Sequence, residues 1–205
     1  MMKRDSKVIK RIFTLLHTQY CKDVSIQTRT DKLVQYSLYG LHNMNFEDQE
    51  IANIVDLLVQ HLRAIPNCDV DCMCKILHSL KHQSCGRTVN QLLETVNEKL
   101  SDSKTSSVSP SSISRGLFGL TEMSTETPVL RTLDIFTKAI DDLPDNSMKS
   151  EHFESLFSGF KMMDSDTDQV RSILCALSKQ MNTMESPLTV EAKVKILYGL
   201  RNMNH

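Results

Sequence analysis

The chain is poor in turn-forming residues and lacks the segments that cross membranes. Its 205 residues include only 6 Gly, 5 Pro and no Trp, too little turn chemistry for a sandwich or barrel of many short strands. No run approaches the roughly 18 consecutive apolar residues that span a bilayer, so we expect no membrane partner. The 24 Lys and Arg balance 25 Asp and Glu to a net charge of -1, which excludes a surface that is basic all over. We predict a single all-α domain over residues 1–205.

The N-terminal segment and the cysteines bear on the compartment. Residues 1–11 are basic but lack the apolar core of a secretory signal, so we expect an intracellular protein with reduced thiols and favour the cytoplasm. The segment is also amphipathic, as in transit peptides, which leaves a mitochondrion or a plastid as the alternative. Asp5 and the repeat described next favour the interpretation that this segment belongs to the fold.

A five-residue apolar motif recurs every 39 or 40 residues. It aligns without gaps at residues 37–41, 76–80, 116–120, 156–160 and 196–200. Three residues after each motif the chain has Met44, Gln83, Met123, Met163 and Met203. A second apolar pattern of helical period follows the motif, as in Ile51, Ile54, Val55, Leu58 and Leu62. Each unit is therefore predicted to be a pair of helices.

The sequence also predicts where these helices begin and end. The first helix of each pair should end near the methionine, and the second should begin about two residues later. Start signals lie at Asn45 with Asp48, at Ser165 with Asp168, at Asp69 and at Ser109-Pro110.

Stacked helix pairs bury one continuous core, so the predicted architecture is an α-solenoid of about five pairs of ~40 residues, about ten helices. The predicted units are residues 31–64, 70–100, 110–141 and 147–182, with half units at 6–21 and 189–205. A column of small residues occupies one motif position: Gly40, Ser79, Gly119, Gly159 and Gly199. Because Gly costs about 1 kcal/mol of helix propensity, we interpret the column as a site of close helix approach. The alternative is that these glycines only end the helices.

The two half units suggest self-association. Residues 6–21 match a second helix without a first, and residues 189–203 match a first helix without a second. We hypothesise that the helix at residues 189–203 of one chain docks on the helix at residues 6–21 of another chain, head to tail. The alternative is a fragment or a frayed end.

The Leu-Tyr-Gly-Leu segments at residues 38–41 and 197–200, with their polar turns and apolar second helices, resemble octotricopeptide-like helical-hairpin repeats. The resemblance implies a right-handed α-solenoid that binds organellar RNA through a column of first-helix side chains. The chain is equally similar to HEAT-like scaffolds, which bind proteins.

Cationic residues recur on the predicted first helices. The position after the motif holds His42, Lys81, Thr121, Lys161 and Arg201, and a second column holds Lys75, Arg115 and Lys195. Aligned in a stack, either column would face regularly spaced phosphates. The alternative, which the net charge favours, is that these cations lie near helix C-termini and face solvent.

One cluster contains the residue types that bind zinc. On a helix, Cys74, His78 and His82 would share one face at i, i+4 and i+8. The spacing matches no paired-cysteine zinc finger, and His78 takes the motif position of Tyr39 and Phe118, so we favour a packed side chain. The sequence contains no phosphate loop, nucleophile elbow or His-Glu-x-x-His motif. We therefore expect no enzyme, with no catalytic residues, no cofactor and no metal.

These observations favour a non-enzymatic helical-repeat scaffold that binds another protein along the surface of its first helices. The alternative is an RNA-binding α-solenoid of octotricopeptide-like type, whose ligand surface would use His42, Lys81, Lys161, Arg201, Lys75, Arg115 and Lys195. The four methionines of the column either form an adaptable contact stripe or belong to the core.

Overall fold

The computed structural model describes residues 30–103 and 108–203, together with positions 11, 12, 14, 15 and 18. Within these residues every regular element is a helix, which confirms the predicted all-α class. The helices after the N-terminal region are α2 (Asp31–Leu41), α3 (Gln49–Ala64), α4 (Val70–His78), α5 (Arg87–Asp102), α6 (Pro110–Phe118), α7 (Thr127–Asp141), α8 (Ser150–Leu156), the 3-10 helix η3 (Phe157–Phe160), α9 (Asp168–Asn182) and α10 (Val190–Gly199). Most of the predicted half unit at 6–21 lies outside the described residues.

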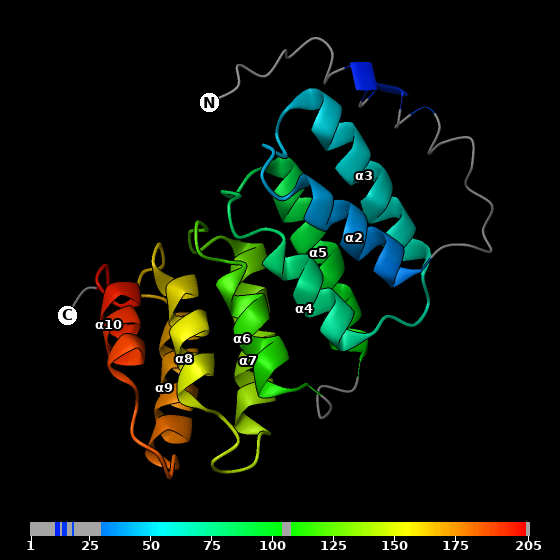
Figure 1. Ribbon diagram of the computed structural model, residues 1–205. Helices are drawn as coiled ribbons and strands as arrows, with labels where there is room; N and C mark the ends of the chain where they lie inside the picture. Colours follow the sequence, from blue (N-terminus) through cyan, green and yellow to red (C-terminus); the bar gives the residue numbers. More distant parts are fainter. Residues whose placement is uncertain (1–10, 13, 16–17, 19–29, 104–107, 204–205) are drawn as a thin grey trace.

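The helices lie in two layers (Figure 1). The first layer runs through α2, α4, α6, α8 with η3, and α10, each in contact with the next. The second layer runs through α3, α5, α7 and α9 in the same way. Successive helices of the chain therefore alternate between the layers, and neighbours within a layer are about 40 residues apart in the sequence.

The first-layer helices end earlier than the sequence predicted. They end at positions 41, 78, 118, 160 and 199, three to five residues before the methionine column. The chain then turns, and the amides of Met44, Met123 and Met163 each donate to the carbonyl three residues back. The apolar pattern continues through these turns because the turns pack on the core: Met123 and Met163 are buried. Because these turns are buried, their apolar residues made the first-layer helices look longer in the sequence than they are in the structure.

The second-layer helices also start later than predicted, four or five residues after the methionine column. Asp48 and Thr167 occupy the N-cap positions of α3 and α9, so the start signals at Asn45 and Ser165 were placed three and two residues too early. The other two start signals are confirmed. Asp69 and Ser109 cap α4 and α6, each accepting a backbone N–H of the first turn.

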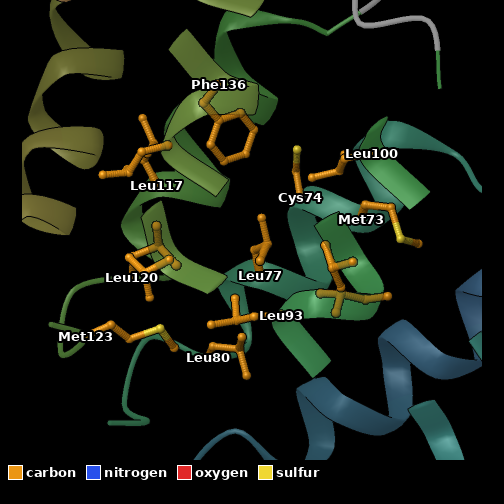
Figure 2. Packing of buried hydrophobic residues seen from close by; sticks show 14 of the residues in the cluster. Met73, Cys74, Leu77, Leu80, Leu93, Leu100, Leu117, Leu120, Met123 and Phe136 are labelled. Atoms are coloured by element: carbon orange, nitrogen blue, oxygen red, sulfur yellow. The ribbon is translucent and has the colours of Figure 1, made fainter. Parts of the chain in front are cut away.

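The core fills the space between the layers (Figure 2). Leu77 of α4 and Leu117 of α6 hold the same motif position and lie in one cluster with Phe136 of α7. All three side chains are at most 1% exposed. Each fully buried side chain of this size contributes about 1.5–3 kcal/mol of transfer free energy, so these contacts help to hold the first layer on α7.

The methionine column belongs mainly to this core. Met123 and Met163 are at most 1% exposed, and Met44 and Met203 are partly buried against the cluster. The alternative of an exposed methionine contact stripe is therefore wrong for Met123 and Met163. In the second unit the column holds Gln83, whose buried amide donates to the carbonyls of His42 and Met44, at 3.2 and 2.8 Å.

The glycine column marks close contacts between first-layer helices. A Cβ atom on one of three glycines would overlap a backbone carbonyl of the preceding first-layer helix. The overlap is with Leu77 for Gly119, with Leu117 for Gly159 and with Phe157 for Gly199. The predicted close approach is confirmed at these three positions. It is wrong at Gly40, where a Cβ atom would meet nothing within 4 Å. The second unit has Ser79 instead, and its hydroxyl donates to the Ile76 carbonyl of its own helix.

Buried polar contacts join neighbouring helices of the second layer. The amide of Asn97, which is 0% exposed, donates to the Pro128 carbonyl and accepts from the Thr132 hydroxyl, both at 2.8 Å. The ammonium of Lys99 donates to the carbonyls of Arg63 and Ile65 at the end of α3. The Lys99 contacts satisfy carbonyls at the C-terminus of α3, where the last carbonyls have no partner within their own helix.

Candidate functional site

The candidate site is the outer surface of the first layer. The predicted cations Lys75, Arg115 and Lys195 lie on α4, α6 and α10, while His42, Lys81, Lys161 and Arg201 lie in the turns just after the first-layer helices. We call this the first-layer surface. It is defined by those seven residues and the aromatic side chains between them: Tyr36, Tyr39, His78, His82, Phe118 and Tyr198.

One carboxylate joins two of the predicted cations. The Lys75 ammonium lies 2.6 Å from one oxygen of Asp71, and the Arg115 guanidinium lies 3.0 Å from the other. Ser112 also donates its hydroxyl to Asp71, at 2.7 Å. Burial raises the pKa of Asp71, but the hydrogen bonds from Lys75 and Ser112 and the two positive charges outweigh it and lower the pKa below its usual value. Asp71 thus links α4 to α6 as an anion.

Two further cations of the predicted columns are paired. The Lys161 ammonium lies 2.6 Å from Glu122, and that of Lys195 lies 3.6 Å from Glu154. Partly exposed pairs of this kind contribute only about 0.2–1 kcal/mol each to stability. Their main effect is on the charge of the surface, because four of the six Lys and Arg side chains among the predicted residues have a carboxylate beside them.

The remaining three predicted residues differ from one another. The guanidinium of Arg201 lies 4.0 Å from the centre of the Tyr198 ring, a cation–π contact. The ring of His42 stacks on Tyr39. In the described part of the chain, Lys81 forms no ion pair within 4.0 Å. The seven predicted residues therefore lie on first-layer helices or in the turns after them, and four of them are paired with carboxylates.

Sequence reasoning missed the extent to which aromatic rings line this surface. Tyr39, His42 and His82 form a stacked series with ring centres 4.9 and 6.2 Å apart. His78 stacks on Phe118 of the next first-layer helix, at 5.5 Å. The signal was present in the motif, whose third residue is aromatic or His in four of the five units.

A hollow of about 340 Å³ lies between α4, α6 and α8 on this surface. Its lining combines both charges and aromatic groups: His78, Ser111, Ser114, Arg115, Phe118, Glu151, His152 and Ser155. A mixed lining of this kind can accept side chains of a polypeptide.

The zinc hypothesis fails on helix geometry. Helix α4 ends at His78, so His82 lies beyond the helix and does not share its face. Cys74 is 0% exposed, and burial raises the pKa of its thiol to about 12. It therefore behaves as a core side chain. Among the residues that the structure describes, no three His, Cys, Asp or Glu side chains lie close enough together to hold a metal ion.

The stability of the fold is expected to decrease as the pH falls from 7.5 to 5.5. Burial and then the Lys81 charge lower the pKa of His78, and burial lowers that of His152. The unfolded chain, with His pKa about 6.5, binds more protons in this range than the folded chain does. Stability is therefore complete above about pH 6.5 and is lost as the pH falls toward the lower folded pKa.

Urea unfolding at the two pH values measures this loss. The variant His78→Phe, which copies the residue at the same position of the next unit, should show a smaller loss than the wild-type protein. An equal loss in both proteins would show that His78 does not contribute to the pH dependence.

Comparison of the chain with protein-family models, curated proteins and solved structures finds no match. No helix in the described ranges is long and apolar enough to cross a bilayer.

Proposed function

We propose that the protein is a non-enzymatic α-solenoid scaffold whose first-layer surface binds a segment of another protein. The solenoid interpretation is supported by the recurring motif and by helices that contact their counterparts about 40 residues away. In such an array equivalent positions line up along one surface, which suits an extended or helical partner.

The observation that carries the proposal is the pairing of the cations with carboxylates. Asp71 pairs with both Lys75 and Arg115, Glu122 pairs with Lys161, and Glu154 pairs with Lys195. Nucleic-acid affinity depends on cations that are free to replace the counterions of phosphates. A surface of mixed charge favours a polypeptide that carries both charges over a polyphosphate chain.

The aromatic side chains support the same class of partner. Tyr36, Tyr39 and Tyr198 are 67%, 53% and 52% exposed. Tyrosine, arginine and other aromatic residues are enriched in protein interfaces, where each ring covers a large area at a small entropic cost. The His78–Phe118 stack beside the 340 Å³ hollow is the strongest candidate for an anchor point.

Selection of a random peptide library on the purified chain tests this proposal. Selected peptides should bind the double variant His78→Ala/Phe118→Ala at least about tenfold more weakly than the wild-type protein, because the stacked rings form the anchor. The matched control is Arg131→Ala, at an exposed position of α7 in the second layer. It should leave the affinity unchanged, and circular dichroism should show both variants to be folded.

Two outcomes contradict the proposal. One is a set of peptides that does not distinguish the two variants. The other is binding of single-stranded RNA at about 0.15 M salt that weakens steeply as salt increases, which would favour the RNA-binding alternative.

A further inference from the structure

We propose that the two ends of the first layer in the described fold fit one another, so that α10 of one copy of the chain packs against α2 of a second copy, head to tail. The contact would be heterologous, using two different surfaces of the same protein. Its geometry is already present inside the chain.

Three internal contacts define this geometry. Gly119 lies against the Leu77 carbonyl, Gly159 against that of Leu117 and Gly199 against that of Phe157. Each pair is 42 positions apart: 77 to 119, 117 to 159 and 157 to 199. A glycine on one helix thus faces the backbone of the second motif residue on the preceding helix.

Each end of the layer presents one half of this contact without its counterpart. Gly40 on α2 is exposed and has nothing within 4 Å of its Cβ position. Leu197 on α10 is 72% exposed, whereas its equivalents Leu38, Leu77, Leu117 and Phe157 are at most 3% exposed. Packing α2 of a second copy on α10 would place Gly40 against the Leu197 carbonyl and bury the leucine.

The side chains next to Gly40 and Leu197 would also be compatible with each other in this contact. In the α8–α10 contact Glu154 pairs with Lys195, at 3.6 Å. By motif position, Val194 of α10 corresponds to Glu154, and Tyr36 of α2 corresponds to Lys195. Val194 and Tyr36 are 60% and 67% exposed. An apolar pair therefore takes the place of the internal ion pair.

More apolar side chains extend both surfaces. Val190 on α10 is 71% exposed, and Leu33 on α2 is 39% exposed. Exposed apolar groups gathered on one helix face mark an interaction site. Because apolar positions meet apolar positions and the glycine meets the carbonyl, a second copy of this chain is the occupant that the two surfaces fit.

This contact differs from the head-to-tail hypothesis drawn from the sequence, which placed α10 against residues 6–21. In the structure α10 packs on α8 and η3, which are first-layer elements. The proposed contact therefore joins a first-layer helix of one copy to a first-layer helix of the next copy. Since each added copy leaves one surface open, association continues until a ring closes or a filament grows.

The substitution Gly40→Ala tests the contact without disturbing the isolated chain. The added methyl group meets open space in one copy, but in the proposed contact it would collide with the Leu197 carbonyl. Sedimentation velocity should show wild-type mass increasing with protein concentration. Both Gly40→Ala and Leu197→Glu should weaken association at least about tenfold. The control Met162→Glu, at a side chain that is 46% exposed outside both surfaces, should associate like the wild type.

Mixing the two variants gives a sharper result. Gly40→Ala retains an intact α10 surface, and Leu197→Glu retains an intact α2 surface, so the mixture should form a one-to-one dimer and nothing larger. A wild-type protein that stays monomeric to about 1 mM, undiminished association of Gly40→Ala, or a mixture that stays monomeric would each overturn the proposal.

Discussion

Alanine at Gly119 is expected to lower the free energy of unfolding by about 2–3 kcal/mol, whereas alanine at Gly40 is expected to raise it by about 0.5–1 kcal/mol. The two glycines hold the same motif position. At Gly119 the new methyl group would overlap the Leu77 carbonyl, so α4 and α6 must move apart. At Gly40 the methyl group meets nothing within 4 Å, so only the improved helix propensity remains.

Urea unfolding of the two variants and the wild-type protein measures these changes. The experiment is best done at low protein concentration, because self-association would add its own stabilisation to the wild type. Gly159→Ala provides a second test, since its Cβ would overlap the Leu117 carbonyl. A stabilised Gly119→Ala variant would show that the glycine column does not mark close helix contacts.

Truncation of Phe136 to alanine is expected to destabilise the fold by about 3–5 kcal/mol. The ring is 1% exposed and lies in the same buried cluster as Leu77 and Leu117 (Figure 2). Its removal leaves a cavity that the surrounding helices cannot fill without losing their own contacts. Phe118→Ala is the matched control. Because Phe118 lies half-buried on the first-layer surface, its truncation should cost no more than about 1.5 kcal/mol.

A double-mutant cycle with Gly116 extends this test. A Cβ atom on Gly116 would lie 2.6 Å from the Phe136 ring, so Gly116→Ala should cost about 1–3 kcal/mol in the wild-type background. In a Phe136→Leu background, which shortens the side chain at this point, the cost should be smaller. Strictly additive free energies of unfolding would contradict the contact.

The candidate site could be predicted only in part from the sequence. The motif placed Lys75, Arg115 and Lys195 at equivalent positions, and the structure has them on α4, α6 and α10 of one layer. It did not predict that Asp71 would bind both Lys75 and Arg115. Asp71 and Arg115 are 44 residues apart, and a single sequence does not state which side chains of neighbouring units meet.

Helix ends were predicted less well than helix existence. The apolar pattern runs through Met123 and Met163 because these turns are buried, and burial alone does not separate a helix from a packed turn. The same limitation produced the zinc hypothesis, which required a helix that continued to His82, four residues beyond the end of α4.

By itself the sequence determined the all-α class, the position of most helices and the column of small residues, because these depend on local propensity and on the spacing of apolar side chains. Only the tertiary structure decided which glycines lie against a neighbouring backbone, which cations are paired with carboxylates and which apolar faces stay exposed. Gly40 and Gly119 have the same place in the motif, and they differ in whether another helix of the described fold lies against them. That difference is a property of the packed chain, and no local pattern encodes it.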